Sequence, residues 1–331
     1  MAVPTNTLQT FPQVNIREDL SNFVHNVDPY KTPLLNMAKR AKAENIHHEW
    51  DIDALDAQSL ANAQIQGDDA TADALAVSGR LGNFTQIARK VVAIARTAQA
   101  VRAAGGTNKM GYQLLKKTKS LKIDIEGSLT NNVAGSAGSS GVAGISAGLP
   151  AFITTNTQFQ TGGAPSGANP VGVVTVNGKT FGNGTTARTD NSAHVAVTET
   201  QLRTVLQSTF VQSGRIPDYM LVSAANKQII STFTGPSGTL FREVQDKTLH
   251  VAVDEYDSDF GKIRFVPDLF LARSKDIFGI TREYVRVAYL SPFTTVPLAK
   301  TGDSDRKMLI VEYSLEVDNE HALCGIFDTT G

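Results

Sequence analysis

Residues 107–132 read TNKMGYQLLKKTKSLKIDIEGSLTNN, and this stretch decides how the rest of the chain is interpreted. Its apolar residues recur at the spacing of one helix face, and they are Met110, Leu114, Leu115, Leu121, Ile125 and Leu129. Thr107 or Asn108 can cap a helix here, and Asn131 and Asn132, before a glycine-rich run, can end it. The stretch therefore predicts one helix of roughly 40 Å, longer than most helices of globular proteins.

Four lysines of this stretch fall mostly on the opposite arc of the helix, and they are Lys109, Lys116, Lys117 and Lys119. We therefore expect a strut that lays its apolar side on a sheet and exposes its basic side. Polar or glycine-rich sequence on both sides of the strut indicates that it connects separate lobes.

The composition excludes several classes of protein. The 331 residues carry 31 Lys and Arg against 32 Asp and Glu, which gives no reason to expect a dedicated nucleic-acid binder. A single cysteine, Cys324, excludes an intrachain disulfide framework and a multi-cysteine zinc site. The N-terminus has no signal-sequence pattern, and no apolar run approaches the ~20 residues that span a bilayer. We expect synthesis in a reducing cytoplasm and no membrane partner.

Residues 1–45 form a predicted arm rather than a domain. Prolines divide it into short pieces, and they are Pro4, Pro12, Pro29 and Pro33. Short amphipathic helices are expected within residues 16–27 and 32–38. An arm with apolar stripes and no core of its own needs another surface, on the same subunit or on a neighbour. The sequence favours the neighbour.

Residues 46–104 are predicted to form a long two-stranded excursion. One strand leaves over 47–52 and a second returns over 83–94, before a short helix over 95–104. The connection between the strands is mostly polar residues and alanine. Because a hairpin of this kind buries little of itself, we expect an intersubunit loop.

Two polar regions follow the strut. Within residues 105–150, the strut gives way to a Gly/Ser run that is expected to be a flexible linker. Residues 151–197 are a polar insertion, in which Asn177 and Gly178 favour a tight hairpin turn within 171–181. We interpret this insertion as surface decoration.

Residues 198–275 are the most domain-like part of the chain. Thr198 and Gln201 fit a capping box, and Gly214 can end that helix. A buried strand is expected over 217–222, followed by a second helix capped by Ser223. Two more strands are expected, around 249–253 and 263–266, joined through the residues 257–261.

Residues 276–331 are expected to supply the remaining strands of the platform under the strut. One face of the strand at 308–317 is uniformly apolar, and its residues are Leu309, Val311, Tyr313, Leu315 and Val317. Residues 198–275 would then be a lobe inserted between two parts of this platform, in an α+β fold.

No motif predicts a catalytic, cofactor or metal site. His47 and His48 are adjacent on a strand, so they point to opposite faces and do not easily share an ion. Asp257 and Asp259 lie in a sequence typical of a turn, far from a complete EF-hand loop. There is no G-x-S-x-G elbow and no phosphate loop, and Cys324 fits a buried core thiol. We therefore expect no enzyme activity.

Four groups of residues, in order along the chain, resemble those of a known family. They are 17–20 with 28–35 and 48–50; 113–117 with 124–126; 213–218; and 298–304 with 312–316 and 319–320. On these residues the chain resembles the major capsid (major head) proteins of tailed bacteriophages, with the Hong Kong 97 type of fold. Within these it is similar to the podophage major head protein family.

The resemblance implies an N-terminal arm over 1–45, an extended loop over 46–104 and a spine helix with its linker over 105–150. It implies an axial domain over 198–275 and a peripheral domain completed by 276–331. Copies would assemble into pentamers and hexamers, and then into an icosahedral shell around the phage double-stranded DNA. The partners would be further copies, a portal, and scaffold or decoration proteins, and the location would be the virion.

Eight residues are candidate contacts in such a shell. Phe23, Trp50, Phe84 and Arg89 are candidates for intersubunit contacts. The strut lysines, Lys109, Lys116, Lys117 and Lys119, could face the lumen and bind packaged DNA without sequence preference. We favour the other interpretation, in which they form a solvated helix face or pair with acidic groups of a neighbouring subunit.

Two other classes of protein stay open at this point. A phage tail or adhesin-type module would use the 151–196 segment as a binding lobe and would form trimers or rings rather than closed shells. A hydrolase would use His47 and His48, and bound zinc would be its sign.

Overall fold

The computed structural model describes residues 31–67, 69, 72–101, 109–233, 255–271, 275–300 and 302–330. Its helices are α1 (Pro33–Met37), α2 (Arg96–Ala100), α3 (Lys109–Thr130), α4 (Glu199–Ser213) and α5 (Ala224–Ile230), with 3-10 helices η1 (Leu149–Ala151) and η2 (Glu320–Ala322). Its strands are β1 (Lys39–Lys42), β2 (His47–Ile52), β3 (Gly79–Phe84), β4 (Gln86–Ala95), β5 (Thr157–Phe159), β6 (Val173–Val176), β7 (Lys179–Gly182), β8 (Tyr219–Val222), β9 (Glu255–Ser258), β10 (Gly261–Pro267), β11 (Ile277–Ile280), β12 (Val285–Pro297), β13 (Ser304–Val317) and β14 (Cys324–Phe327).

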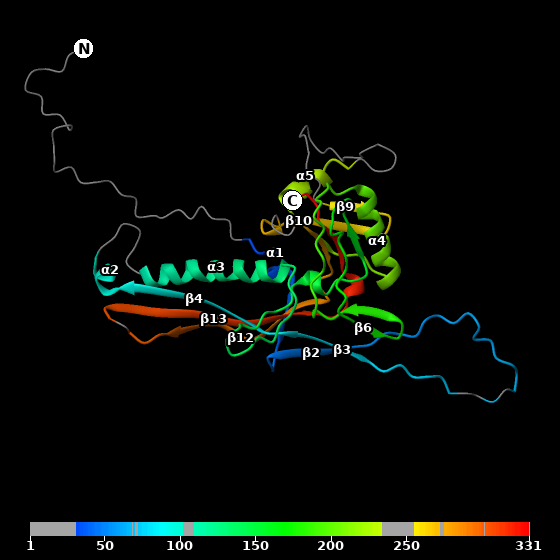
Figure 1. Ribbon diagram of the computed structural model, residues 1–331, viewed down its shortest axis with the longest axis horizontal. Coiled ribbons are helices and arrows are strands. Elements are labelled where there is room, and N and C mark those ends of the chain that lie inside the picture. Colours follow the sequence, from blue (N-terminus) through cyan, green and yellow to red (C-terminus); the bar gives the residue numbers. More distant parts are fainter. Residues whose placement is uncertain are drawn as a thin grey trace, which may run out of the picture.

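A long platform carries a compact lobe at one end (Figure 1). The platform is a four-stranded sheet in the order β1-β12-β13-β4, with α3 packed along β4 and β13. The apolar face predicted for residues 308–317 is buried, as the alternation of the strand requires. The chain therefore forms the long helix on a sheet that was predicted from residues 107–132.

Only the C-terminal half of α3 is deeply buried. Leu121, Ile125 and Leu129 are at most 1% exposed, whereas Leu115 is 67% exposed. The expectation that Leu115 belongs to the buried face is wrong. The first half of the helix lies toward the end of the platform that β1 does not reach, where the sheet consists of β12, β13 and β4, and Leu115 at the edge of the apolar arc stays exposed there.

The predicted return strand over 83–94 is two strands in two different sheets. β3 pairs antiparallel with β2, while β4 pairs antiparallel with β13. The break falls at buried Thr85, whose N–H donates to the Ile46 carbonyl at 2.8 Å and whose hydroxyl donates to Glu312 at 2.8 Å. The excursion is therefore rooted on the platform at Thr85, and only its outer part leaves the body.

The lobe is built on a mixed six-stranded sheet in the order β5-β14-β11-β8-β10-β9, packed against α4 and α5. The capping box of Thr198 and Gln201 is present, Gly214 ends α4 with φ 70°, and Ser223 caps α5. The strand expected around 249–253 lies outside the described residues. Residues 257 and 258, expected in a connection, instead lie in β9, which pairs antiparallel with β10.

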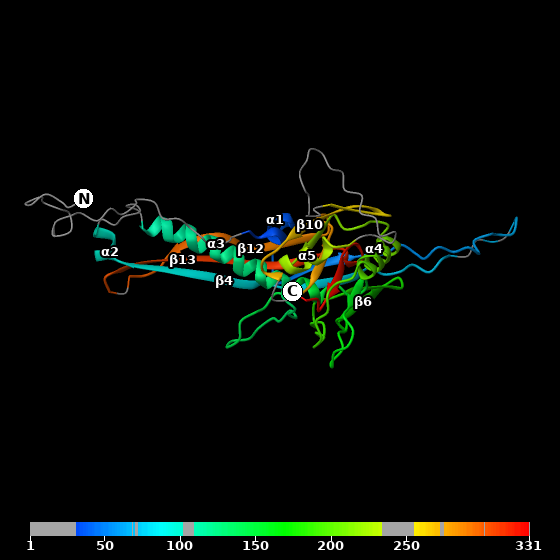
Figure 2. The ribbon, with the colours of Figure 1, turned by 90° about the horizontal axis from the view of Figure 1, so that it is seen from above.

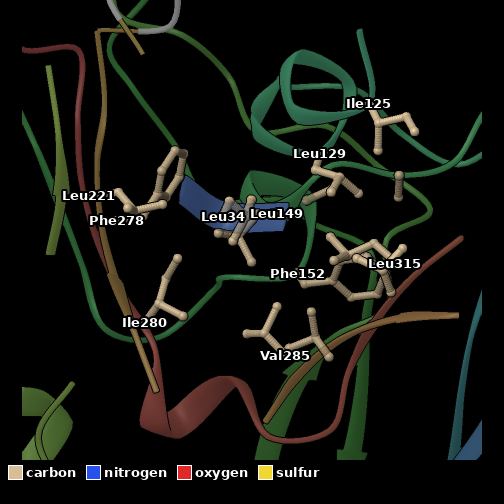
Figure 3. Close-up of a cluster of buried hydrophobic side chains, with 14 of the residues drawn as sticks. Leu34, Ile125, Leu129, Leu149, Phe152, Leu221, Phe278, Ile280, Val285 and Leu315 are labelled. Atoms are coloured by element: carbon tan, nitrogen blue, oxygen red, sulfur yellow. The ribbon is translucent and has the colours of Figure 1, made fainter. Parts of the chain in front are cut away.

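The boundary expected at residue 276 does not match the sheets. β11 and β14 lie in the six-stranded sheet of the lobe, where β11 pairs with β8, and only β12 and β13 complete the platform. Because the chain crosses between the two sheets repeatedly, one core spans both. Figure 3 shows this core, in which Leu34 and Leu149 lie between Leu129 of α3 and Leu221 and Phe278 of the lobe.

The end of the predicted arm packs on its own subunit. Leu34 of α1 is fully buried in the shared core, and β1 adds to the platform by pairing parallel with β12. The expectation of a neighbour as the surface is therefore wrong for residues 31–45, because these residues supply both an apolar anchor and a strand. The helix expected over 16–27 lies outside the described residues.

The two polar regions after α3 are more ordered than expected. The Gly/Ser run forms a hairpin in which Ser136 bridges Ile145 and Ser139 bridges Val142. The start of the insertion is not surface decoration, because Phe152 and Ile153 are fully buried in the shared core. The hairpin of β6 and β7 is confirmed, with Asn177 at φ 48° and Gly178 at φ 76° as its tight turn.

Candidate assembly surfaces

The loop between β2 and β3 exposes apolar side chains along its length. Five of them are 78–93% exposed, and they are Leu55, Leu60, Ile65, Leu75 and Val77. Both views show the loop projecting from the body near its junction with the lobe (Figures 1 and 2). Near its root, Asn177 of the β6–β7 turn donates to the Ala54 carbonyl at 3.2 Å and to Asp56 at 2.6 Å. The loop thus presents a line of apolar groups to solvent, a feature typical of binding surfaces.

The face of the platform opposite α3 is also partly apolar. Ile87 and Val91 of β4 are exposed on it, and Arg89 lies between them. Directly opposite residues of antiparallel strands share a face, so Met308 and Ile310 of β13, partners of Val91 and Arg89, continue this surface. Arg89 is therefore the interface candidate that the structure places on an open surface.

The charges of the loop and the platform are opposite in sign. Residues 53–78 contain five aspartates and no lysine or arginine. The far end of the platform is basic, with the strut lysines on α3 and a hollow of about 360 Å³ lined in part by Lys300, Arg306 and Lys307. The loop is therefore acidic and apolar, whereas the hollow at the far end of the platform has more basic than acidic side chains around it.

The strut lysines are not equivalent. Lys109 donates to the carbonyls of Ala98 and, at 3.0 Å, Val101, so it ties α3 to the end of α2. Lys116 and Lys119 are exposed, whereas Lys117 is half-buried. The structure therefore does not present the four as one continuous exposed face.

Trp50 and Phe84, two further interface candidates, have contacts inside the chain. The Trp50 indole donates to the Val317 carbonyl at 3.1 Å, and its ring lies 6.1 Å from that of Phe152. Phe84 stacks on His47 with ring centroids 4.5 Å apart. Trp50 thus anchors β2 to the platform, and Phe23 lies outside the described residues.

Adjacent histidines on β2 point to different surroundings, as predicted. His47 contacts Phe84 and Glu49, and His48 approaches Glu316 at 3.1 Å. Within the described ranges, no group of three or more His, Cys, Asp or Glu side chains could hold a metal ion. Cys324 is fully buried, and burial raises the pKa of its thiol to about 12, so it is an unreactive core residue.

A buried ionic cluster that sequence reasoning missed fixes the insertion to the lobe. The Arg188 guanidinium binds both oxygens of Asp276 at 2.8 and 2.9 Å, Asp328 at 3.2 Å and Asp190 at 3.0 Å. Burial raises the pKa of Asp276 to about 7, although Arg188 opposes that shift. Nothing in the local sequence distinguishes Arg188 from an exposed arginine.

A second buried carboxyl, Glu320, holds the beginning of the insertion. Its oxygens accept hydrogen bonds from the Thr154 N–H and hydroxyl, both at 2.6 Å. Burial raises the pKa of Glu320 to about 7. Next to it, burial lowers the pKa of His321 to about 4, so this histidine is neutral. These contacts are structural, and they hold the beginning of the insertion against η2.

Comparisons with known proteins fit this geometry. A family model described as SU10 major capsid protein matches residues 3–330. The chain belongs to this family. A curated major capsid protein of Escherichia phage Phieco32 is 30% identical over 126 residues, which are 38% of this chain and 36% of that relative. The match thus spans about a third of the relative's length.

Solved structures show the same fold at low identity. The cyanophage A-1(L) capsid asymmetric unit has a TM-score of 0.63 at 12% identity, with 96% of this chain and 98% of that chain covered. Gordonia phage Cozz gives a TM-score of 0.56 at 10% identity, with 98% of each chain covered. The predicted α+β fold of the Hong Kong 97 type is confirmed, and so is the resemblance to phage major capsid proteins.

Members of a major capsid protein family are structural proteins, and these matches give no support to the tail or adhesin alternative. No helix among the described residues is long and apolar enough to cross a membrane.

Proposed function

We propose that this chain self-assembles through pentamers and hexamers into the icosahedral head that encloses a phage double-stranded DNA genome, and that it catalyses no reaction. The observation that carries the proposal is the extended loop, whose apolar side chains are 78–93% exposed in the single subunit. A soluble protein rarely leaves such a line of side chains in water unless another molecule covers it.

Assembly would depend on many weak contacts that are repeated between copies of the subunit. The loop of one subunit would lie on the open face of a neighbour's platform, its aspartates beside basic residues such as Arg89. The arm predicted over residues 1–45 would add contacts with neighbours, and the lobe would make the contacts around the five-fold and six-fold axes as the axial domain. Each contact would be weak, but many identical ones close a stable shell.

The strut lysines would act in one of two ways. Lys116 and Lys119 would contact packaged DNA without sequence preference, each phosphate contact adding roughly one unit of salt dependence, or they would pair with acidic groups of a neighbour. Replacing both with glutamine separates the two. Loss of genome retention from intact shells supports the DNA role, and defective shells support the pairing.

A portal protein, and a scaffold or decoration protein, would complete the particle. The head would be built in the cytoplasm of the host bacterium, and the protein would then reside in the virion.

Negative-stain electron microscopy of the full-length chain, expressed alone and together with the neighbouring phage genes, tests this function. We expect closed shells tens of nanometres across in at least one condition. Only small rings, trimers or monomers in both conditions would contradict the proposal.

A further inference from the structure

Glu126 lies where three parts of the molecule meet. It belongs to α3, it is fully buried, and its two carboxyl oxygens accept hydrogen bonds from the N–H groups of Leu34 at 2.7 Å and Leu35 at 2.8 Å. These are the free N–H groups of the first turn of α1, which has no side-chain cap of its own from Thr32. Glu126 therefore fastens the base of the arm to the spine helix.

Asp268 brings the lobe to the same point. It follows β10, is 1% exposed, and its N–H donates to the Val222 carbonyl at the end of β8. Its Oδ1 accepts the Phe270 N–H at 2.9 Å, whereas its Oδ2 is buried and has no donor. A buried carboxylate oxygen without a donor is costly, and the neighbouring group that faces Asp268 is the Glu126 carboxyl.

Two buried carboxyls side by side cannot both be ionised at low cost. One proton between them supplies the donor that Asp268 lacks and leaves both oxygens of Glu126 able to accept from α1. The pKa of Glu126 is raised to about 8, mainly by burial and also by the charge of Asp268, against the lowering effect of the N–H groups of Leu35 and Leu34. Burial also raises the pKa of Asp268.

Few other charges reach this pair. Helix α1 reads PLLNM and contributes no titratable side chain. The buried cluster to which its Leu34 belongs is apolar, and it includes Leu129, Leu221 and Leu271. On α3, Lys122 is exposed, and Asp124 pairs with Lys90 of β4. None of the ion pairs among the described residues includes Glu126 or Asp268.

We propose that Glu126 and Asp268 share one proton and form a pH-sensitive joint that holds α1, α3 and the lobe together. Loss of this proton leaves two negative charges facing each other in an apolar site, so the joint opens. The base of the arm at α1 is then released from the spine helix, and the lobe loses one of its attachments to the platform.

The direction of the pH effect follows from the raised affinity for the proton. In an opened joint, Glu126 has its ordinary pKa of 4.5, whereas in the closed joint the pKa is about 8. The closed joint is therefore favoured fully below pH 4.5, and it weakens steadily as the pH rises to about 8. Above that value the effect levels off.

Hydrogen–deuterium exchange of peptides covering residues 31–38 tests the joint. The full-length chain is kept in one assembly state, checked by light scattering, from pH 5 to 9. After correction for the intrinsic exchange rate, we expect the opening constant to rise by up to about tenfold per pH unit, by at least about tenfold in total, and then level off near pH 8. A flat profile in the wild-type chain would overturn the proposal.

Two variants separate a shared proton from a lone buried carboxyl. Glu126→Gln removes most of the rise, because the main titrating group is gone. Asp268→Asn keeps an acceptor for the Phe270 N–H and removes the negative charge beside Glu126. The pH at which the opening constant stops rising should therefore be lower than in the wild-type chain. If the opening constant of Asp268→Asn stops rising at the same pH as in the wild-type chain, Glu126 titrates alone.

The matched control is Asp257→Asn, an exposed position in β9 of the same lobe, which should retain the wild-type profile. If Glu126→Gln does not fold, the wild-type profile and its shift in Asp268→Asn still decide the question. A wild-type rise with no difference between Asp268→Asn and Asp257→Asn contradicts the shared proton.

Discussion

The shared core and the extended loop contain the same kinds of apolar residue in opposite surroundings. In the core, Phe152 and Leu129 are at most 1% exposed and join the platform to the lobe. In the loop, Leu60 and Leu75 are more than 90% exposed and have no comparable packing inside the chain. The apolar residues of this chain therefore perform two tasks: one set folds the subunit, and the other is available to a neighbour.

Removing a core side chain should have the largest effect on the single subunit. Phe152→Ala leaves a cavity at the junction of the two sheets, and we expect a loss of about 3–5 kcal/mol in the free energy of unfolding. Chemical denaturation of the unassembled subunit measures it. Leu60→Ala is the matched control, with an expected change within about 0.5 kcal/mol. Equal losses at the two positions would erase the distinction between core and loop.

Breaking the ion pairs of Arg188 should have the second-largest effect on the stability of the single subunit. Arg188→Ala leaves Asp276 and Asp328 buried without a cation, and we expect a loss of about 3 kcal/mol. Arg203→Ala, which breaks an exposed pair with Asp259, should cost less than about 1 kcal/mol. Comparable midpoints of denaturation for the two variants would show that the insertion is not fixed by Arg188.

The buried carboxyls predict a dependence of core stability on pH. Burial raises the pKa of Glu126 to about 8 and the pKa values of Asp276 and Glu320 to about 7, so the folded state binds protons that the unfolded state has released. Their stabilisation is present near pH 5 and is lost as the pH rises to about 8. We expect the free energy of unfolding to be at least about 2 kcal/mol higher at pH 6 than at pH 8, which is the difference that Glu126 alone contributes. A higher value at pH 8 would contradict this.

Changing the loop should have the smallest effect on the subunit. The combined variant Leu55→Ser, Leu60→Ser and Leu75→Ser removes side chains that are 88–93% exposed, so the free energy of unfolding should change by no more than about 0.5 kcal/mol. Thermal unfolding of the unassembled subunit checks this. A clear loss of stability would show that the loop packs on its own body.

Periodic and capping patterns in the sequence predicted much of the fold. The alternation from Leu309 to Val317 is a property of neighbouring residues, and so are the capping box at Thr198 and the Asn177-Gly178 turn. These local signals were correct because the tertiary structure did not oppose them.

The buried polar residues could not be predicted in the same way. Asn83 binds the Leu315 carbonyl at 2.8 Å and the Ala147 N–H at 2.8 Å, but in the sequence it resembles any asparagine beside a glycine. The position of Glu126 weakly indicated burial, since it adjoins Ile125 and lies one turn before Leu129. Leu115 shows the converse, because helix periodicity cannot tell where the surface beneath a helix becomes narrow.

The predicted interface residues lie in two different kinds of surroundings for the same reason. Trp50 is used inside the chain and Arg89 lies on an open face, although both occur in similar alternating strands. Which face of a strand is covered depends on partners far away in the sequence, and a single sequence does not contain that information.

The most direct test of the two-task account is electron microscopy of the Leu55→Ser, Leu60→Ser, Leu75→Ser variant beside the wild-type chain, at matched concentration and with matched unfolding midpoints. We expect closed shells from the wild-type chain, and from the variant folded subunits or small rings that do not close. Closed shells of normal size from the variant would contradict the claim that the loop's apolar side chains serve the neighbouring subunit.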